Sequence, residues 1–169
     1  MSKNLKLLTT LGVSTAAAMI LSFLETLIPM NFAVPGVKIG LANLVTVFLL
    51  LKIDWKSAAA VTAVRVLLSA LLFGSVASLL YSASGALLSM AVMALLKKTG
   101  RFSTLGISTA GAVSHNAGQI IMAVILLSTK EIAYWLPVLI ATGTVTGLAI
   151  GAVGALLVKK IDLNLDRKA

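Results

Sequence analysis

The sequence predicts an all-α integral membrane protein, a single domain over residues 1–169 built as a bundle of six transmembrane helices with both termini in the cytoplasm. Three observations predict this class. Hydrophobic residues make up 59% of the chain and charged residues 11%, which is far from the balance of a soluble domain. The apolar residues gather in six runs, and basic residues stand at the ends of these runs. Because a span needs about 20 residues, the length leaves no room for a soluble catalytic domain.

Charges and turn residues divide the chain into the six apolar runs. They cover residues 5–28, 39–53, 57–73, 76–96, 104–127 and 132–158. The first run is longer than the apolar core of a signal peptide, so we expect it to remain as the first span. The second run is short for a bilayer. We expect it either to lie beside a thinned or water-filled region or to extend into the loop before it.

Basic residues predict the orientation of the spans. If the N-terminus is cytoplasmic, eleven Lys and Arg residues fall on the inner side, Lys38 and Lys130 fall on the outer side, and Arg65 lies inside the third span. Positive residues collect on cytoplasmic loops, so both termini are predicted to be cytoplasmic. This scatter at helix ends also argues against a nucleic-acid surface, despite a net charge of +9. The eleven inner residues are Lys3, Lys6, Lys52, Lys56, Lys97, Lys98, Arg101, Lys159, Lys160, Arg167 and Lys168.

The loop between the first two spans is predicted to lie on the outer side. Pro29 and Pro35 stop a helix, and Gly36 permits a tight turn. The segment Pro29–Lys38 has two interpretations, a lid over an outward-facing cavity and a plain connector.

Small residues recur at helical spacing in three of the spans and predict close helix contacts in lipid. In the fifth and sixth spans we expect these surfaces to pack within the bundle. In the first span they could equally dock a partner membrane protein. The candidate docking residues are Gly12, Ser14, Ala16, Ala18 and Ser22; the fifth span has Gly106, Ala110, Ser114 and Gly118, and the sixth has Gly143, Gly147 and Gly151.

Unusual polar residues lie within the spans, and the predicted topology places them in the outer half of the bilayer. Arg65 cannot be deprotonated and must find an anion, carbonyl groups or water. Glu25 is the membrane-embedded acid available to it, so a structural pair is one interpretation. The other is that Arg65, together with Lys38 and His115, receives an anionic or strongly polar ligand from outside.

The segment Ser114–Gln119 contains the single histidine of the chain. His115 and Gln119 are four residues apart and therefore share one helix face, with Asn116 on its flank. His115 is interpreted as a buried neutral imidazole, as a hydrogen-bonding group for a ligand, or as part of a proton relay. The candidate ligand-binding residues are Arg65, His115, Asn116, Gln119, Asn43, Glu25, Lys38 and Tyr81, of which Tyr81 could equally belong to an interfacial aromatic belt.

Signatures of enzymes and metal sites are missing from the sequence. A prenyl diphosphate synthase holds Mg²⁺ and diphosphate with clustered aspartates, whereas Asp54, Asp162 and Asp166 are dispersed and predicted to be cytoplasmic. There is no Gly-x-x-x-x-Gly-Lys-Ser/Thr loop for ATP. One histidine without cysteine cannot form a usual protein-only metal site. We therefore expect no enzyme activity, no metal and no cofactor.

Several segments together resemble a known bacterial membrane family, the Gx transporters, also labelled heptaprenyl diphosphate synthase component I. The resemblance runs over nearly the whole chain. It is carried by Pro35-Gly-Val-Lys-Ile-Gly-Leu-Ala-Asn43, Arg65, Leu72-Phe-Gly74, Tyr81-Ser-Ala-Ser-Gly85 and Ser114-His-Asn-Ala-Gly-Gln119. The family in turn resembles the substrate-binding S components of energy-coupling-factor (ECF) transporters.

The resemblance implies a six-helix protein of the bacterial cytoplasmic membrane that binds a small polar or anionic nutrient, or a cofactor or quinone precursor, near the outer face. It implies a transmembrane coupling subunit and two ABC ATPases as partners. S components commonly carry an Ala-x-x-x-Ala docking pattern in the first helix, which Gly12 and Ala16, or Ser14, Ala18 and Ser22, match only approximately. Two alternatives remain, a non-catalytic membrane subunit of prenyl diphosphate or quinone biosynthesis and an accessory to extracellular electron transfer.

Overall fold

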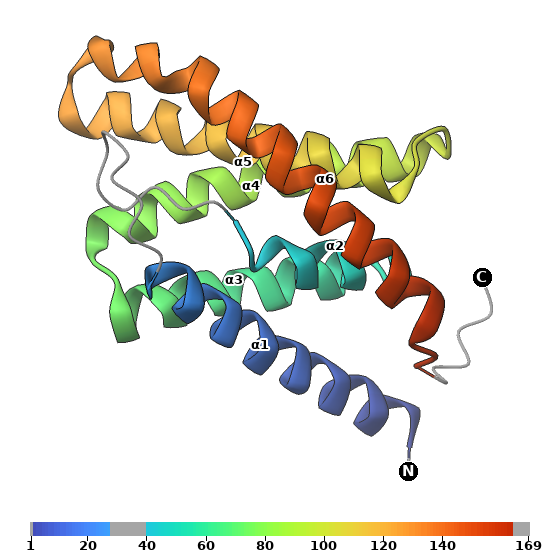
Figure 1. Cartoon of the computed structure of the whole chain (residues 1–169). Coiled ribbons are helices and arrows are strands. Elements are labelled where there is room, and N and C mark those ends of the chain that lie inside the picture. Colours follow the sequence, from blue (N-terminus) through green and yellow to red (C-terminus); the bar gives the residue numbers. More distant parts are fainter. Residues whose placement is uncertain (1, 28–39, 164–169) are drawn as a thin grey trace.

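The computed structural model of the chain describes residues 2–27 and 40–163, and this part is helical without any strand. The predicted all-α class is confirmed. The elements in order are α1 (Lys3–Leu27), α2 (Asn43–Lys52), α3 (Trp55–Phe73), α4 (Val76–Thr99), α5 (Thr104–Leu127), the 3₁₀ helix η1 (Lys130–Trp135) and α6 (Leu136–Lys160), shown in Figure 1.

Within residues 2–27 and 40–163, five helical segments are long and apolar enough to cross a membrane: α1, α3, α4, α5 and the continuous η1–α6 segment. Helix α2 is the exception, because its 10 residues extend about 15 Å, half of a hydrocarbon core of about 30 Å. It begins later than the predicted run because Gly40 has a φ of +94°, which a right-handed helix cannot contain. Of the six predicted spans, five correspond to long helices, and the second, which was predicted to be short, corresponds to the short helix α2.

Polar side chains at the turns explain where three helices begin. Asp54, Ser75 and Ser103 each accept a hydrogen bond from a backbone N–H in the first turn of α3, α4 and α5, over 2.7, 3.1 and 3.2 Å. Such caps each stabilise a helix by about 1 kcal/mol. Helix α4 ends at Gly100, which has a φ of +67°, the left-handed conformation that glycine adopts without strain. These local signals keep the turns short.

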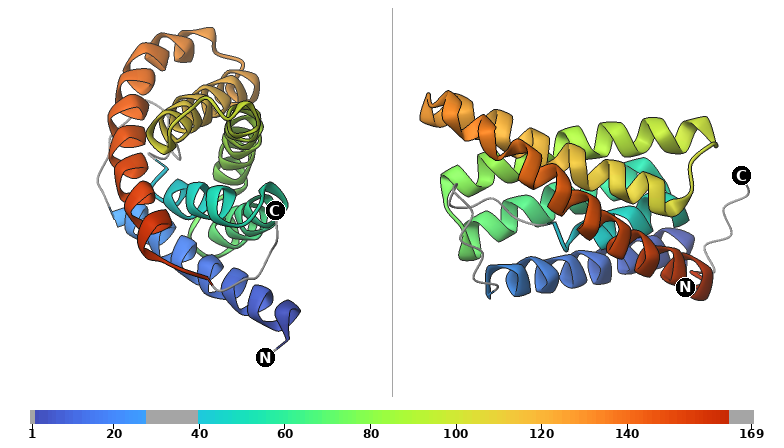
Figure 2. Two further views of the ribbon diagram at one scale, coloured as in Figure 1. Left: turned by 90° about the vertical axis from the view of Figure 1, so that its right-hand side faces the viewer. Right: turned by 45° about the horizontal axis from the view of Figure 1, so that its top comes forward.

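The helix ends are sorted into two groups along the bundle. The α3–α4 turn, the start of α6 and the end of α1 lie at one end, while the N-terminus, the end of α6 and the α2–α3 and α4–α5 turns lie at the other (Figure 1). Helix α2 is the interior helix, since most of its residues are buried and it contacts α1, α3, α5 and α6. The ring formed by the other helices is visible along the bundle in Figure 2.

Glycines allow the closest helix contacts, which α5 makes with α4 and α6. A β-carbon added to Gly118 would lie 2.7 Å from the Ser84 carbonyl oxygen, and one added to Gly147 would lie 2.6 Å from Thr109 Cα. Both contacts involve backbone atoms, so a larger residue has no space. The predicted packing role of the glycine surfaces is confirmed at these positions.

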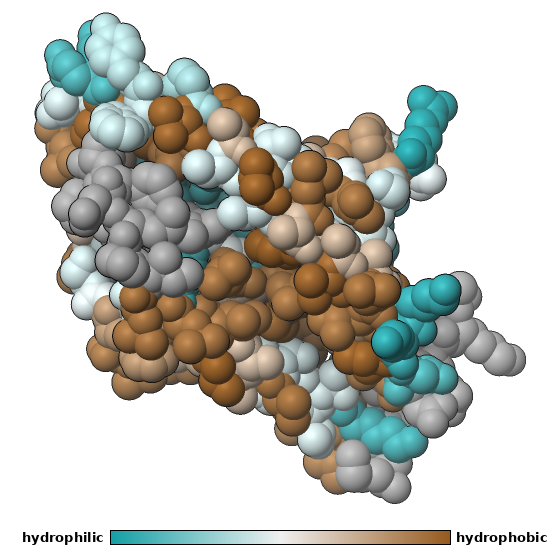
Figure 3. All heavy atoms as spheres, viewed as in Figure 1, coloured by the Kyte–Doolittle hydropathy of each residue, from teal (hydrophilic) through white to brown (hydrophobic). Residues whose placement is uncertain are grey.

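The surface of the bundle is a broad apolar band. Hydrophobic residues cover most of the face in Figure 3, and hydrophilic residues gather at its two ends. Large side chains such as Leu71, Val76 and Leu87 are more than 70% exposed. An apolar surface of this extent marks a membrane contact rather than a water-exposed surface. The chain is a multi-pass membrane protein.

The predicted orientation can be tested by cysteine labelling, because the chain contains no cysteine. A cysteine replacing Tyr134, which is 82% exposed in η1, is expected to react from outside with a membrane-impermeant maleimide in intact cells. A cysteine replacing the exposed Arg101 is expected to react only after the membrane is permeabilised. The reverse labelling pattern would show that the orientation drawn from basic residues is wrong.

Candidate ligand-binding site

The predicted ligand-binding residues lie inside the bundle. All seven that fall within residues 2–27 and 40–163 are at most 6% exposed. Lys38 and the whole predicted lid segment Pro29–Lys38 lie outside the described residues. The seven are Glu25, Asn43, Arg65, Tyr81, His115, Asn116 and Gln119. The structure gathers them into two groups, one on α1–α3 and one on α4–α6.

The first group, the α1–α3 cluster, consists of Ser22, Glu25, Gly40, Asn43 and Arg65. Arg65 donates a long hydrogen bond of 3.5 Å from Nη1 to the Ser22 hydroxyl, and Glu25 interacts favourably with its charge. Glu25 Oε1 also accepts a hydrogen bond from the Gly40 backbone N–H. Asn43 Nδ2 lies next to Gly40, 3.1 Å from where a β-carbon would be. The cluster therefore connects the end of α1 and the start of α2 to the middle of α3.

Arg65 faces inward because one side of α3 is built from small polar residues. Thr62, one turn earlier, forms a 2.9 Å hydroxyl–hydroxyl hydrogen bond with Thr46 of α2. Ser69, one turn later, donates to the Met19 sulfur of α1 over 3.5 Å. This face turns toward α1 and α2 on both sides of the arginine, which fixes the direction of its side chain.

The second group, the α4–α5 cluster, contains Tyr81, Gly85, His115 and Gln119. A β-carbon on Gly85 would lie 2.8 Å from the His115 carbonyl oxygen and 3.0 Å from both His115 Cε1 and Gln119 Cγ. His115 and Gln119 therefore share the face that packs on α4, and neither is directed to lipid. Tyr81 is buried and packs against Ala123, so it is not an exposed belt residue.

Asn116 points toward a different helix from its two neighbours. Its Nδ2 donates a 2.6 Å hydrogen bond to the Leu139 carbonyl oxygen of α6. A β-carbon on Gly143 would lie 2.8 Å from the same nitrogen. Asn116 thus joins α5 to α6, a structural contact that the sequence pattern did not show. Its Oδ1 has no hydrogen-bond partner among the described residues.

Several buried polar atoms have no hydrogen-bond partner within residues 2–27 and 40–163. Burying such a group costs about 1–3 kcal/mol, so a concentration of them indicates a place for a ligand or ordered water. Three of them, the hydroxyls of Ser82, Ser89 and Ser108, are not distinguishable as site residues in the sequence, because serine is common in membrane helices and often bonds to its own backbone. The atoms are Asn43 Nδ2, Arg65 Nε and Nη2, Asn116 Oδ1, Gln119 Nε2 and Oε1, and the three hydroxyls.

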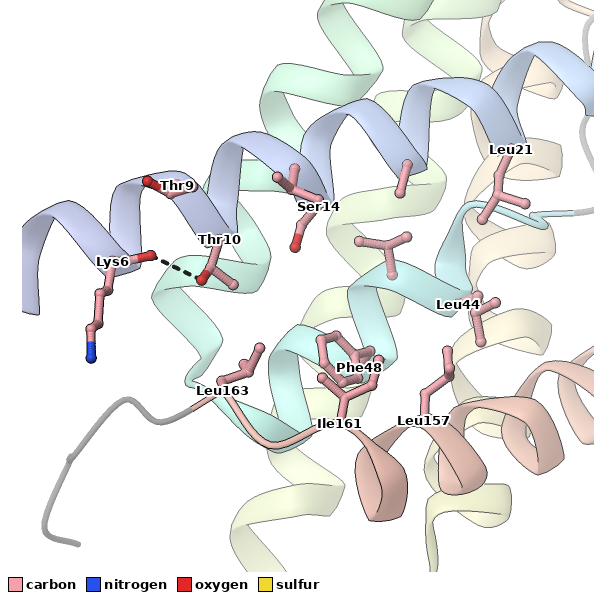
Figure 4. Close-up of a pocket in the computed structure, with 13 residues that line it drawn as sticks. Lys6, Thr9, Thr10, Ser14, Leu21, Leu44, Phe48, Leu157, Ile161 and Leu163 are labelled. Carbon is pink, nitrogen blue, oxygen red and sulfur yellow. Dashed lines mark hydrogen bonds between the residues drawn. The ribbon is translucent and has the colours of Figure 1, made fainter. Parts of the chain in front are cut away.

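Two grooves in the described structure are apolar and are lined by other residues. One, of about 530 Å³, lies between α1, α2 and the end of α6 and is shown in Figure 4. The Thr10 hydroxyl on its wall donates to the Lys6 carbonyl of its own helix over 2.9 Å. The other, of about 300 Å³, lies between α3 and α4. The predicted ligand-binding side chains are closed within the bundle instead.

The candidate docking residues of α1 divide between two faces. Gly12 and Ala16 are exposed, and no atom lies within 4 Å of a β-carbon placed on Gly12. Ser14, Ala18 and Ser22 are buried against the bundle. A partner helix can therefore reach Gly12 and Ala16, while Ala18 and Ser22 take part in internal packing and Ser14 lines the groove of Figure 4.

A family model described as Heptaprenyl diphosphate synthase component I matches residues 14–157. This range runs from the middle of α1 to the last turns of α6 and includes every described member of both clusters. No curated protein and no solved structure matches the chain.

Proposed function

The chain belongs to the heptaprenyl diphosphate synthase component I family, and we propose a function for it on that basis. In this proposal the chain is the substrate-binding membrane subunit, or S component, of an ECF-type importer in a bacterial cytoplasmic membrane. It captures a small polar or anionic nutrient, or a cofactor or quinone precursor, from outside. Transport energy comes from two ABC ATPases through a transmembrane coupling subunit.

The observation that carries the proposal is the set of buried, unpaired polar atoms around Arg65 and Gln119. A guanidinium in a membrane protein interior costs several kcal/mol unless it is paired. Two of its three nitrogens have no hydrogen-bond partner among the described residues. A bound polar ligand would accept hydrogen bonds from these two nitrogens. If Arg65 had only a structural role, its donors would be expected to bond to other groups of the bundle.

The placement of the acids supports binding rather than synthesis. Asp54 caps α3 through its side chain, and Asp162 follows the end of α6. Glu25 is tied to the α1–α2 junction at Gly40. A synthase needs several carboxylates around one Mg²⁺–diphosphate, and these three acids lie at three separate places in the fold. We therefore propose that the chain binds its ligand without converting it.

The test is gentle purification of the tagged full chain from its own membrane, followed by native mass spectrometry. The proposal expects a retained water-soluble small molecule and copurification with a coupling subunit and ATPases. Gly12→Leu, on the exposed face of α1, is expected to lose the partners while keeping the small molecule. Copurification with a prenyl diphosphate synthase subunit, without any retained water-soluble molecule, would overturn the proposal in favour of a biosynthetic subunit, which the family description favours.

A further inference from the structure

The unpaired nitrogens of Arg65 lie on one edge of its guanidinium. Nη1 is the nitrogen that reaches Ser22, and the two without a partner among the described residues are Nε and Nη2. Nη2 is the terminal nitrogen on the Nε–H side of the planar group. The Nε–H and one Nη2–H bond therefore point side by side in the same direction, as a two-donor fork.

A fork of this kind matches the two oxygens of a carboxylate, which accept two parallel hydrogen bonds from it. The third unpaired donor of the α1–α3 cluster is Asn43 Nδ2. The fork alone pairs with both oxygens of one carboxylate. The Ser22 hydroxyl oxygen accepts the hydrogen bond from Nη1.

A phosphate group fits these surroundings less well. It carries a charge of about −1.5 to −2 and three strong acceptor oxygens. Glu25 is close enough to act on the charge of Arg65, so a dianion bound to Arg65 would also meet the repulsion of this carboxylate. A monoanion meets less repulsion and leaves fewer oxygens without donors.

We propose that the ligand is a carboxylic acid whose carboxylate binds the Nε–Nη2 edge of Arg65, inside the α1–α3 cluster. This inference rests on the proposed function and specifies the chemical class of the molecule that is bound. Lysine cannot reproduce the fork although it keeps the charge. Glu25 lies beside the site as a competing anion, so its neutralisation favours the bound carboxylate.

The experiment measures binding to the full chain, washed free of small molecules, in lipid nanodiscs. The probes are acid and amide pairs of equal shape, benzoate with benzamide and nicotinate with nicotinamide, together with inorganic phosphate. Thermal stability and isothermal titration are recorded for the wild type, Arg65→Lys and Glu25→Gln. We expect at least one acid to bind the wild type at least tenfold more tightly than its amide and than phosphate. Arg65→Lys is expected to lose this preference, and Glu25→Gln to keep or strengthen it.

The other outcomes separate this inference from the proposed function. If an amide or phosphate binds as tightly as the acids, the carboxylate inference is overturned and the binding function stands. If Glu25→Gln loses acid binding as Arg65→Lys does, the inference is also overturned, because Glu25 would then be required. If no probe binds, the inference is overturned, and the native mass spectrum of the unwashed protein decides the proposed function separately. Melting curves without probe show whether each variant is folded.

Discussion

Replacing Arg65 with glutamine is expected to abolish retention of the small molecule that the proposed function expects the wild type to carry in native mass spectra. Glutamine keeps part of the volume and some hydrogen bonding but removes the charge and the two-donor edge that has no partner among the described residues. Removing one side of a buried charge-assisted contact costs about 2–5 kcal/mol of binding free energy. This corresponds to a loss in affinity between about thirtyfold and several thousandfold, enough to release the ligand during purification.

The control for charge is Lys56→Gln, which removes a cation from an exposed position in the first turn of the same helix. It is expected to retain the small molecule at the wild-type level. The outcome that contradicts the prediction is an Arg65→Gln protein that keeps its ligand but melts at a lower temperature. Arg65 would then be a structural partner of Glu25, the alternative that the sequence left open.

Replacing Gly147 with leucine is expected to have the largest effect on stability of any substitution considered for the bundle. The added β-carbon alone would lie 2.6 Å from Thr109 Cα and 3.0 Å from Ala112 Cβ, so α5 and α6 would have to separate. Overpacking a well-packed contact costs about 1–3 kcal/mol and occasionally more, and a whole side chain against backbone belongs at the upper end. We expect the variant either to aggregate or to melt at a much lower temperature than the wild type. Size-exclusion chromatography of heated samples in detergent measures both outcomes.

The control for Gly147→Leu is the same replacement at an open position, Gly12→Leu in α1. No atom lies within 4 Å of a β-carbon at this position, so the leucine would extend into lipid. Its melting temperature is expected to equal or exceed that of the wild type, because leucine favours a helix more than glycine does by up to about 1 kcal/mol. Equal destabilisation at Gly12 and Gly147 would show that the effect comes from loss of glycine itself and not from the α5–α6 contact.

The long helices could be predicted from the sequence because each is bounded by charges or turn residues that also act in the structure. The predicted run 57–73 corresponds to α3, which begins at Trp55 after the Asp54 cap, and the run 104–127 corresponds to α5 after the Ser103 cap. Helix α2 was predicted less well, since apolar residues continue before it while Gly40 interrupts the right-handed conformation. The hydrophobic pattern indicates which residues are buried in lipid or protein. It does not indicate the φ angle of a single glycine, so it could not predict where α2 begins.

The candidate site was predicted in part. The burial of polar side chains followed from their position in apolar runs, and the shared face of His115 and Gln119 followed from helical spacing. The contact of Asn116 with the Leu139 carbonyl could not be predicted, because it depends on which helix lies beside α5. The sequence also could not predict that Gly12 and Ala16 are exposed while Ser14, Ala18 and Ser22 are buried. Which face of α1 meets the bundle depends on how the helices assemble.

The unequal packing of the bundle has a mechanical consequence. Helices α4, α5 and α6 are in contact through glycines and backbone, while α1 buries the smallest share of its residues among the long helices. Bending the three close-packed helices would break many short contacts at once, whereas displacing α1 would exchange mostly apolar side chains with lipid and break the few polar contacts of Met19, Ser22 and Glu25. The protein is therefore stiff on one side and compliant on the other. Because Arg65 donates to Ser22 on the less buried helix, we expect opening of the α1–α3 cluster to proceed by movement of α1, with the α4–α6 half as its fixed support.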